Sequence, residues 1–375
     1  MDRRRFLAAL GMATNAVFEF PELASGAEQA GNTSPAISGQ PQSARTDFFP
    51  GFQTRDINAS NATIHLVMAG SGPPVLLLHG YPQTHIIWRK IAPQLTQKFT
   101  VVAPDLRGYG DSRRPPEGQD HFGYSKRAMA QDQLDVMEQL GFKRFAIVGH
   151  DRGGRVAHRL ALDHPDSVER LALLDIVPTQ KLYANVTREF ATDYFHWFFL
   201  IQPAPLPELL ITNSIEGWLT WALDGSPPAW MEEAAYQEYL RCLRKPGTVH
   251  AHCEDYRAAA TIDLEHDAAD LQRKIDCPLL ALWGSKGAMQ ALYDVAQTWR
   301  ERASDVRGKM LDAGHFVPEE ASSALLAELL VFLQPRWEKF LLSESLHSEP
   351  QAVRAQASSD YPKFPRSRHV NHTKR

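Results

Sequence analysis

The residues best suited to chemistry lie in one glycine-rich turn, Gly149-His150-Asp151-Arg152-Gly153-Gly154. The apolar run at 145–148 predicts a buried strand before it, and residues 155–162 predict a helix after it. Glycines two positions before and after a central residue suit a sharp strand-to-helix turn, because a Cβ at either place would meet the neighbouring backbone. The central residue then sits at a helix N-terminus, where oriented N–H groups favour an anion. Since that residue is Asp151, the turn predicts a carboxylate nucleophile that displaces a leaving group from a saturated carbon and becomes an ester.

A histidine and a second carboxylate fit the same chemistry. His315, in the run Asp312-Ala313-Gly314-His315-Phe316, follows the last predicted strand and is a candidate base for activating water. Such a base needs an orienting carboxylate, but the loop at 284–288, after the strand at 279–283, contains none. We expect Asp175, at the end of the strand at 170–174, to orient His315 instead.

Two backbone N–H groups are candidates for an oxyanion hole. The run His79-Gly80-Tyr81-Pro82 closes the strand at 75–79 and offers the N–H of Tyr81. The N–H of Arg152, directly after the nucleophile, would be the second donor.

Arg152 and Arg155 place two cations in the first turn of the predicted helix, where the helix dipole disfavours them. A guanidinium can hold a carboxylate through two parallel hydrogen bonds, so both arginines predict an acidic substrate. An ion pair with Asp or Glu elsewhere in the chain is the alternative.

The predicted elements alternate strands with helices, which indicates an α/β fold with a mostly parallel sheet and flanking helices. A helix is expected at 125–140, ending at Gly141. Between 179 and 267 the strand rhythm disappears and tryptophans and prolines accumulate, which predicts an inserted helical cap over the carboxyl edge of the sheet. The expected strands lie at 62–68, 75–79, 100–103, 145–148, 170–174, 279–283 and 309–311.

Length and composition are those of a globular enzyme-sized chain. The 375 residues carry a net charge of −4, which gives no support for binding nucleic acid or a membrane surface. Cys242, Cys253 and Cys277 lack metal-ligand spacing, although a disulfide between the first two stays open.

We expect a leader and linker at 1–47, a core at 48–178 and 268–342, the cap at 179–267, and a disordered tail at 343–375.

The N-terminus, Met1-Asp2-Arg3-Arg4-Arg5-Phe6-Leu7, resembles a twin-arginine export signal. Its apolar stretch is too short to span a bilayer, and small residues at 25–27 offer a cleavage point. The expected location is therefore periplasmic, without stable membrane insertion, and a cytoplasmic location is the alternative.

The body, at about 48–340, resembles the α/β-hydrolase superfamily and, within it, the fluoroacetate (haloacetate) dehalogenases. The likeness rests on four stretches, at 149–159, 196–197, 202–208 and 253–257, which read GHDRGGRVAHR, HW, QPAPLPE and CEDYR. A departure is Tyr81, where Phe is expected in close relatives, although only its backbone should matter.

The resemblance implies a role for each matching residue. Asp151 would be the nucleophile, His315 the base and Asp175 its orienting partner. The substrate carboxylate would be bound by Arg152 and Arg155, and the departing halide by His196, Trp197 and Tyr256.

The implied reaction converts a haloacetate and water to glycolate and halide, without a metal or cofactor, and a homodimer is expected by resemblance. Two rival functions stay open. An epoxide hydrolase would share Asp151 and His315 and would use cap tyrosines to protonate the alkoxide. Arg152 beside the nucleophile would be unfavourable for it. A non-catalytic binding protein of the same fold commonly lacks part of the catalytic set, which is complete here. Trp197 and Tyr256 could also be core residues of an aromatic cap.

Overall fold

The computed structural model describes residues 46–225 and 227–334. The predicted export signal, the tail predicted to be disordered and the last residues of the predicted core lie outside these ranges. Within them, no helix is long and apolar enough to cross a membrane.

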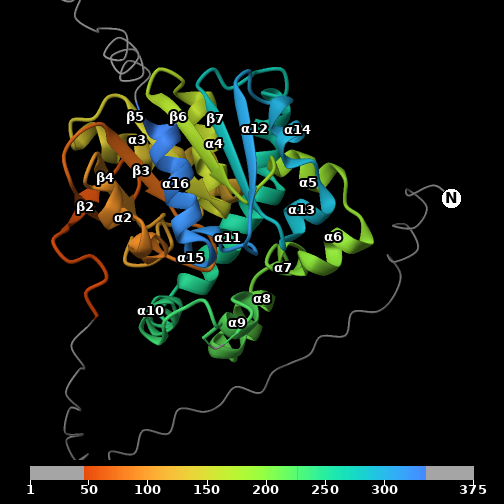
Figure 1. The fold of residues 1–375 in the computed structure, drawn as a ribbon. Helices are drawn as coiled ribbons and strands as arrows, with labels where there is room; N and C mark the ends of the chain where they lie inside the picture. The colour runs from red at the N-terminus through yellow and green to blue at the C-terminus, as the bar shows by residue number, and fades with distance from the viewer. Residues whose placement is uncertain (1–45, 226, 335–375) are drawn as a thin grey trace, which may run out of the picture. The chain divides into compact units, whose positions relative to one another are not determined.

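An eight-stranded sheet forms the centre of the described chain (Figure 1). Its spatial order is β1-β2-β4-β3-β5-β6-β7-β8. The β1–β2 and β2–β4 pairs are antiparallel and every later pair is parallel, which confirms the expected α/β class with a mostly parallel sheet. The strands are β1 Gln53–Asn58, β2 Thr63–Ala69, β3 Pro74–Leu78, β4 Thr100–Pro104, β5 Phe145–His150, β6 Val168–Leu174, β7 Leu279–Gly284 and β8 Val306–Leu311.

Sequence analysis missed β1 and shortened β8, and both are edge strands. β1 reads QTRDIN and is mostly exposed, so it lacks the apolar alternation that signals a strand. β8 begins three residues earlier than the predicted 309–311, and its interior positions are exposed. An edge strand is paired on one side only, so its outer residues can be polar.

Helices cover both faces of the sheet (Figure 1). In that view α16 lies in front of the strands, and α4 packs against β5 and β6. Outside the segment 179–267, the helices are η1 His85–Lys90, α2 Ala92–Leu95, η2 Gln119–Tyr124, α3 Lys126–Gln139, α4 Asp151–Asp163, α13 Ala288–Leu292, α14 Val295–Arg300, α15 Val317–Glu320 and α16 Ser322–Leu333.

The helix expected at 125–140 is α3. Its N-cap is Ser125, whose side chain accepts a hydrogen bond from the Ala128 N–H at 3.1 Å. Gly141 follows the helix with a φ of +89°, a conformation that favours glycine at a helix C-terminus.

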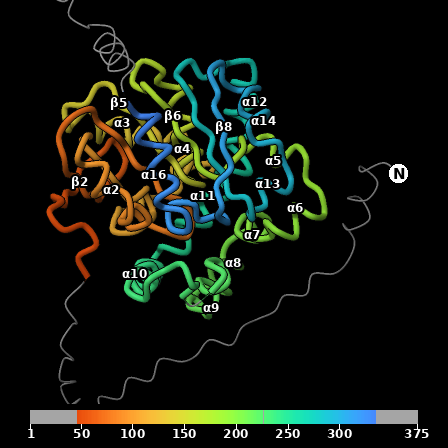
Figure 2. Tube along the Cα trace, viewed as in Figure 1, coloured from red at the N-terminus to blue at the C-terminus, as the bar shows by residue number. Residues whose placement is uncertain are grey.

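In the segment 179–267, of which the structure describes all but residue 226, the regular elements are helices. Figure 1 places α8, α9 and α10 beyond the carboxyl ends of the strands, and the tube trace of Figure 2 follows the chain through them. The boundaries of the cap remain predictions. The elements are α5 Thr179–Ala184, α6 Arg188–Asp193, α7 Phe195–Phe199, α8 Leu206–Thr212, α9 Ile215–Ala222, α10 Glu233–Leu243, α11 Thr248–Ala260 and α12 Ile262–Ala269.

Four parallel strands deliver residues to one edge of the sheet. Tyr81 lies just after β3, Asp151 directly after β5, Asp175 directly after β6, and His315 shortly after β8. Because parallel strands end at the same edge, residues far apart in the sequence meet there, as is usual for sites in open α/β sheets.

Candidate active site

The turn between β5 and α4 has the sharp geometry expected from its glycines. Asp151 has a φ of +44°, a left-handed conformation that is unusual for a residue with a side chain. A Cβ on Gly149 would lie 2.7 Å from the carbonyl oxygen of Gly153, and one on Gly153 would lie 2.3 Å from that of His79. Both flanking positions are therefore restricted to glycine by contact with backbone, and the turn holds Asp151 in a strained position typical of functional sites.

The carboxylate of Asp151 is buried and surrounded by positive charge. The Tyr81 N–H, one of the two predicted oxyanion donors, donates to its Oδ2 at 3.0 Å. Burial alone would raise the pKa of Asp151, but the charges of His315, Arg155 and Arg152 hold it below its ordinary value. Asp151 is therefore ionised at neutral pH, as a carboxylate nucleophile requires.

The predicted pair of base and orienting carboxylate is formed. His315 Nδ1 lies 2.6 Å from Asp175 Oδ2, and the other carboxylate oxygen accepts a hydrogen bond from the Gly284 N–H at 3.0 Å. Burial opposes protonation of His315, but the hydrogen bond and charge of Asp175, with the charge of Asp151, raise the pKa of the imidazole. This arrangement leaves Nε2 as the basic nitrogen when the ring is neutral.

The two arginines of the first turn of α4 are both buried and have different partners. Arg152 forms an ion pair with Asp255, whose Oδ1 lies 2.6 Å from Nη2. Arg155 instead donates from Nη1 to the Val177 carbonyl oxygen and to Thr179 Oγ1, each at 3.0 Å. The alternative of an ion pair elsewhere therefore applies to Arg152, whereas Arg155 has no ion pair in the described chain.

A cavity of about 210 Å³ connects the sheet edge with the helical segment. At roughly seven times the ~30 Å³ occupied by a liquid water, it fits a small molecule rather than a drug-sized one. It brings Asp151 and His315 together with His196 and Tyr256, whereas neither Arg152 nor Arg155 is among its lining residues. The lining residues are Tyr81, Asp151, Asp193, Tyr194, His196, Ala222, Tyr256, Ala288, His315 and Phe316.

Trp197, the remaining predicted halide ligand, is not among these lining residues. Its ring lies 4.6 Å from the Arg155 guanidinium and 5.9 Å from the Tyr256 ring, and it is 1% exposed. Trp197 therefore packs against Arg155 and Tyr256, and its role as a halide ligand remains a prediction.

His196 is a neutral ring held by aromatic neighbours. It packs against Tyr194 and Tyr256, with ring centroids at 5.6 and 5.8 Å. Burial lowers its pKa to about 3, so it carries no charge at neutral pH. Its Nδ1 is buried and has no hydrogen-bond partner in the described structure.

Sequence analysis missed Tyr194 and Asp255. Tyr194 lies two residues before His196 in an aromatic stretch that offers no means of choosing which rings face the cavity. Asp255 directly precedes Tyr256 in one of the stretches that carried the family resemblance, and that place was the available signal.

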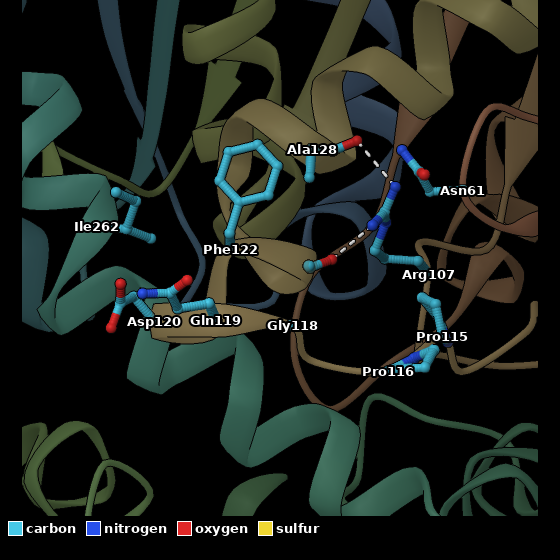
Figure 3. Close-up of a pocket in the computed structure, with 11 residues that line it drawn as sticks. Asn61, Arg107, Pro115, Pro116, Gly118, Gln119, Asp120, Phe122, Ala128 and Ile262 are labelled. Atoms are coloured by element: carbon cyan, nitrogen blue, oxygen red, sulfur yellow. Dashed lines mark hydrogen bonds between the residues drawn. The ribbon is translucent and has the colours of Figure 1, made fainter.

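A larger cavity, of about 570 Å³, lies away from these residues (Figure 3). Pro115, Pro116 and Phe122 line it, and Arg107 donates there to the carbonyl oxygens of Gly123 and Ala128. The Arg107 Nε and Nη2 also bind Asp132, so the guanidinium is occupied within the protein. We therefore place the candidate active site in the smaller cavity.

The free thiols and Arg159 have structural roles. Cys242 and Cys253 are free and buried, so the disulfide left open by the sequence is not formed. Arg159 forms an ion pair with Asp270, with 2.7 Å between Nη1 and Oδ2.

Comparison with known proteins extends these observations. Residues 73–322 match the alpha/beta hydrolase fold family. A fluoroacetate dehalogenase from a Burkholderia species is 46% identical over 276 residues, covering 72% of this chain and 89% of that protein. A soluble epoxide hydrolase from a Corynebacterium species is 36% identical over 279 residues, covering 72% and 94%. A crystal structure of a Nostoc protein assigned as an alpha/beta hydrolase superposes with a TM-score of 0.75 at 56% identity, covering 76% and 98%.

The sheet, the strand-to-helix turn that carries Asp151 and these similarities agree. The chain belongs to the α/β-hydrolase family, and within that family it is similar to fluoroacetate dehalogenase.

Proposed function

We propose that this α/β-hydrolase hydrolyses haloacetates to glycolate and halide through an aspartyl ester. The observation that carries the proposal is the pair of buried arginines in the helical turn that begins at Asp151. A haloacetate is an anion approaching an anionic nucleophile. At ~4 Å and an effective dielectric near 20, the repulsion is about 4 kcal/mol, and adjacent guanidinium groups offset it.

In the first step a carboxylate oxygen of Asp151 attacks the carbon that bears the halogen. The new C–O bond forms as the carbon–halogen bond breaks, and the halide leaves with the bonding electron pair. His196 and Tyr256 line the same cavity and can offer a ring N–H and a phenolic O–H to the departing halide.

In the second step neutral His315 takes a proton from water, and the resulting hydroxide attacks the carbonyl carbon of the ester. The Tyr81 N–H, which contacts the Asp151 carboxylate, can stabilise the oxyanion, with the Arg152 N–H proposed as its partner. The intermediate releases glycolate, the Asp151 carboxylate re-forms, and His315 passes one proton to solvent. The similarity to a fluoroacetate dehalogenase supports this assignment.

The direct test is to incubate the protein with fluoroacetate and chloroacetate and to measure released halide and glycolate. Halide release that Asp151→Asn abolishes is expected. No release from either substrate would contradict the proposal.

Epoxide hydrolysis is the second candidate, and one observation favours it. Tyr194 and Tyr256 line the cavity together with Asp151, and two phenols opposite a nucleophile could protonate the alkoxide of an opening epoxide. The similarity to a soluble epoxide hydrolase is consistent with this candidate. Diol formation from styrene oxide at a rate above that of haloacetate hydrolysis would favour it.

A further inference from the structure

Asp255 binds one edge of the Arg152 guanidinium, the edge formed by Nε and Nη2. Arg152 Nε donates to Oδ2 at 2.9 Å, and Nη2 donates to Oδ1 at 2.6 Å and to the Asp255 carbonyl oxygen at 2.8 Å. Such a bidentate contact fixes the plane of a guanidinium as well as its position. The remaining nitrogen, Nη1, is buried without a hydrogen-bond partner in the described structure.

Asp255 is itself fixed by two further groups. The Lys126 ammonium forms an ion pair with Oδ1, and the Tyr109 hydroxyl donates to Oδ2 at 2.7 Å. All three side chains are buried. On its other side Arg152 lies over the Tyr256 ring, 4.2 Å from the centroid. The carboxylate cannot turn without breaking several contacts, so the direction of Arg152 is set from outside the cavity.

Arg155 differs in its charge balance. Its hydrogen-bond acceptors, Val177 O and Thr179 Oγ1, are neutral. Burial depresses the pKa of Arg155, and the largest opposing influence is the charge of Asp151. For Arg152, which burial also disfavours in its charged form, the largest opposing influence is Asp255, and the pKa rises well above its ordinary value. The positive charge of Arg152 is thus paired inside the protein, in a cluster with Asp255, Lys126 and Asp263. Arg155 has no ion pair in the described chain, and Asp151 is the anion that most favours its charged form.

We propose that Asp255 is a positioning residue and that, because of it, Arg152 and Arg155 have different functions. Arg152, neutralised and aimed by Asp255, supplies a directed N–H edge that orients the substrate carboxylate. Arg155 supplies the unbalanced positive charge that selects an anionic substrate. This inference rests on the proposed function and deepens it, because it assigns orientation and charge selection to different residues.

The test compares Asp255→Asn and Arg155→Gln, with Asp132→Asn as the matched control. Asp132 is a buried carboxylate that binds the Nε and Nη2 groups of Arg107, and neither of these two residues lines the cavity that holds Asp151. Asp255→Asn should lower kcat for chloroacetate roughly tenfold or more without raising KM, because orientation is lost while the local positive charge increases. Arg155→Gln should raise KM for chloroacetate and reduce the preference for chloroacetate over neutral chloroacetamide.

Asp132→Asn should change neither constant by more than about twofold, because Asp132 does not line the cavity that holds Asp151. A rise in KM for Asp255→Asn with kcat unchanged would overturn the inference. So would equal effects of Asp255→Asn and Asp132→Asn, which would show only the general cost of removing a buried carboxylate that binds an arginine. If Asp255→Asn does not fold, Tyr109→Phe decides the matter. It keeps the carboxylate but removes one of its donors, and it should lower kcat while KM stays constant.

Acetate binding, measured by calorimetry, separates this inference from the proposed function because it requires no turnover. Arg155→Gln should weaken acetate binding, and Asp255→Asn should not. If the wild type releases no halide but this pattern holds, the proposed function fails and the division between the arginines stands. If both substitutions weaken acetate equally, the division fails whatever the substrate is.

Discussion

The two sides of the cavity fix their side chains in different ways. On the sheet side, Asp151 and Asp175 follow strand ends and accept hydrogen bonds from the backbone N–H groups of Tyr81 and Gly284. On the helical side, His196 is held by packing of rings, and its Nδ1 has no hydrogen-bond partner in the described structure. A hydrogen bond to the backbone fixes the direction of a side chain, whereas packing between rings fixes mainly the space that a side chain occupies. The sheet side therefore suits the reacting groups, and the helical side suits the choice of substrate and leaving group.

The largest expected effect is on the sheet side. Asp151→Asn should abolish both halide release and ester formation, because it removes the nucleophile. His315→Asn should still form the ester but fail to hydrolyse it, since the base is needed only for the second step. Intact-mass spectrometry after incubation with chloroacetate should show an added carboxymethyl group on the Asp151 peptide. An active Asp151→Ala protein would contradict the assignment for every substrate.

The second-largest expected effect is the loss of kcat/KM when Arg152 or Arg155 is replaced. Arg155→Lys keeps the charge but loses the planar fork that reaches Val177 O and Thr179 Oγ1, and Arg152→Lys cannot keep both contacts with Asp255. Each should lower kcat/KM roughly tenfold or more, since each lost charge-assisted contact is worth about 1.5–3 kcal/mol. Steady-state kinetics with chloroacetate provides the measurement. Equal rates for chloroacetate and chloroacetamide in the wild type would show that the arginines do not bind a carboxylate.

A smaller and substrate-dependent effect is expected on the helical side. Tyr256→Phe should reduce fluoroacetate turnover about tenfold while chloroacetate turnover largely survives, because fluoride concentrates its charge and depends more on hydrogen-bond donors. Trp197→Phe tests the remaining predicted halide ligand by the same ratio. Equal losses on both substrates, with chemistry rate-limiting, would mean that these rings only fill the core.

The smallest expected effect is a shift along the pH axis. The pKa of His315 in the free enzyme is raised above its ordinary value near 6.5, and titration of the ring followed by NMR should report that raised value. Ester formation removes the charge of Asp151, one cause of the rise, so hydrolysis of the ester should reach half its maximum at a lower pH than this midpoint. Single-turnover rates of ester hydrolysis between about pH 5 and 9 would show the second midpoint. A rate that falls as pH rises through this range would exclude His315 as the base.

The sequence by itself determined the sheet side. Glycine spacing identified the turn around Asp151, and short apolar runs identified the strands that deliver Asp175 and His315 to the same edge. These signals are local, because backbone sterics and strand periodicity act over a few residues. The polar edge strand β1 was missed because its pattern lacks that periodicity.

Only the tertiary structure decided which side chains of the helical segment line the cavity with Asp151 and which ones lie outside that lining. The aromatic stretch contains more rings than the cavity can admit, and packing places Tyr194 in the lining but leaves Trp197 out of it. The partner of Arg152 lies about a hundred residues away, at Asp255 in α11, and only the tertiary fold brings the two side chains together. An ion pair on the surface contributes little to stability. Because the Arg152–Asp255 pair is buried, it favours the charged form of Arg152 and fixes the orientation of its guanidinium.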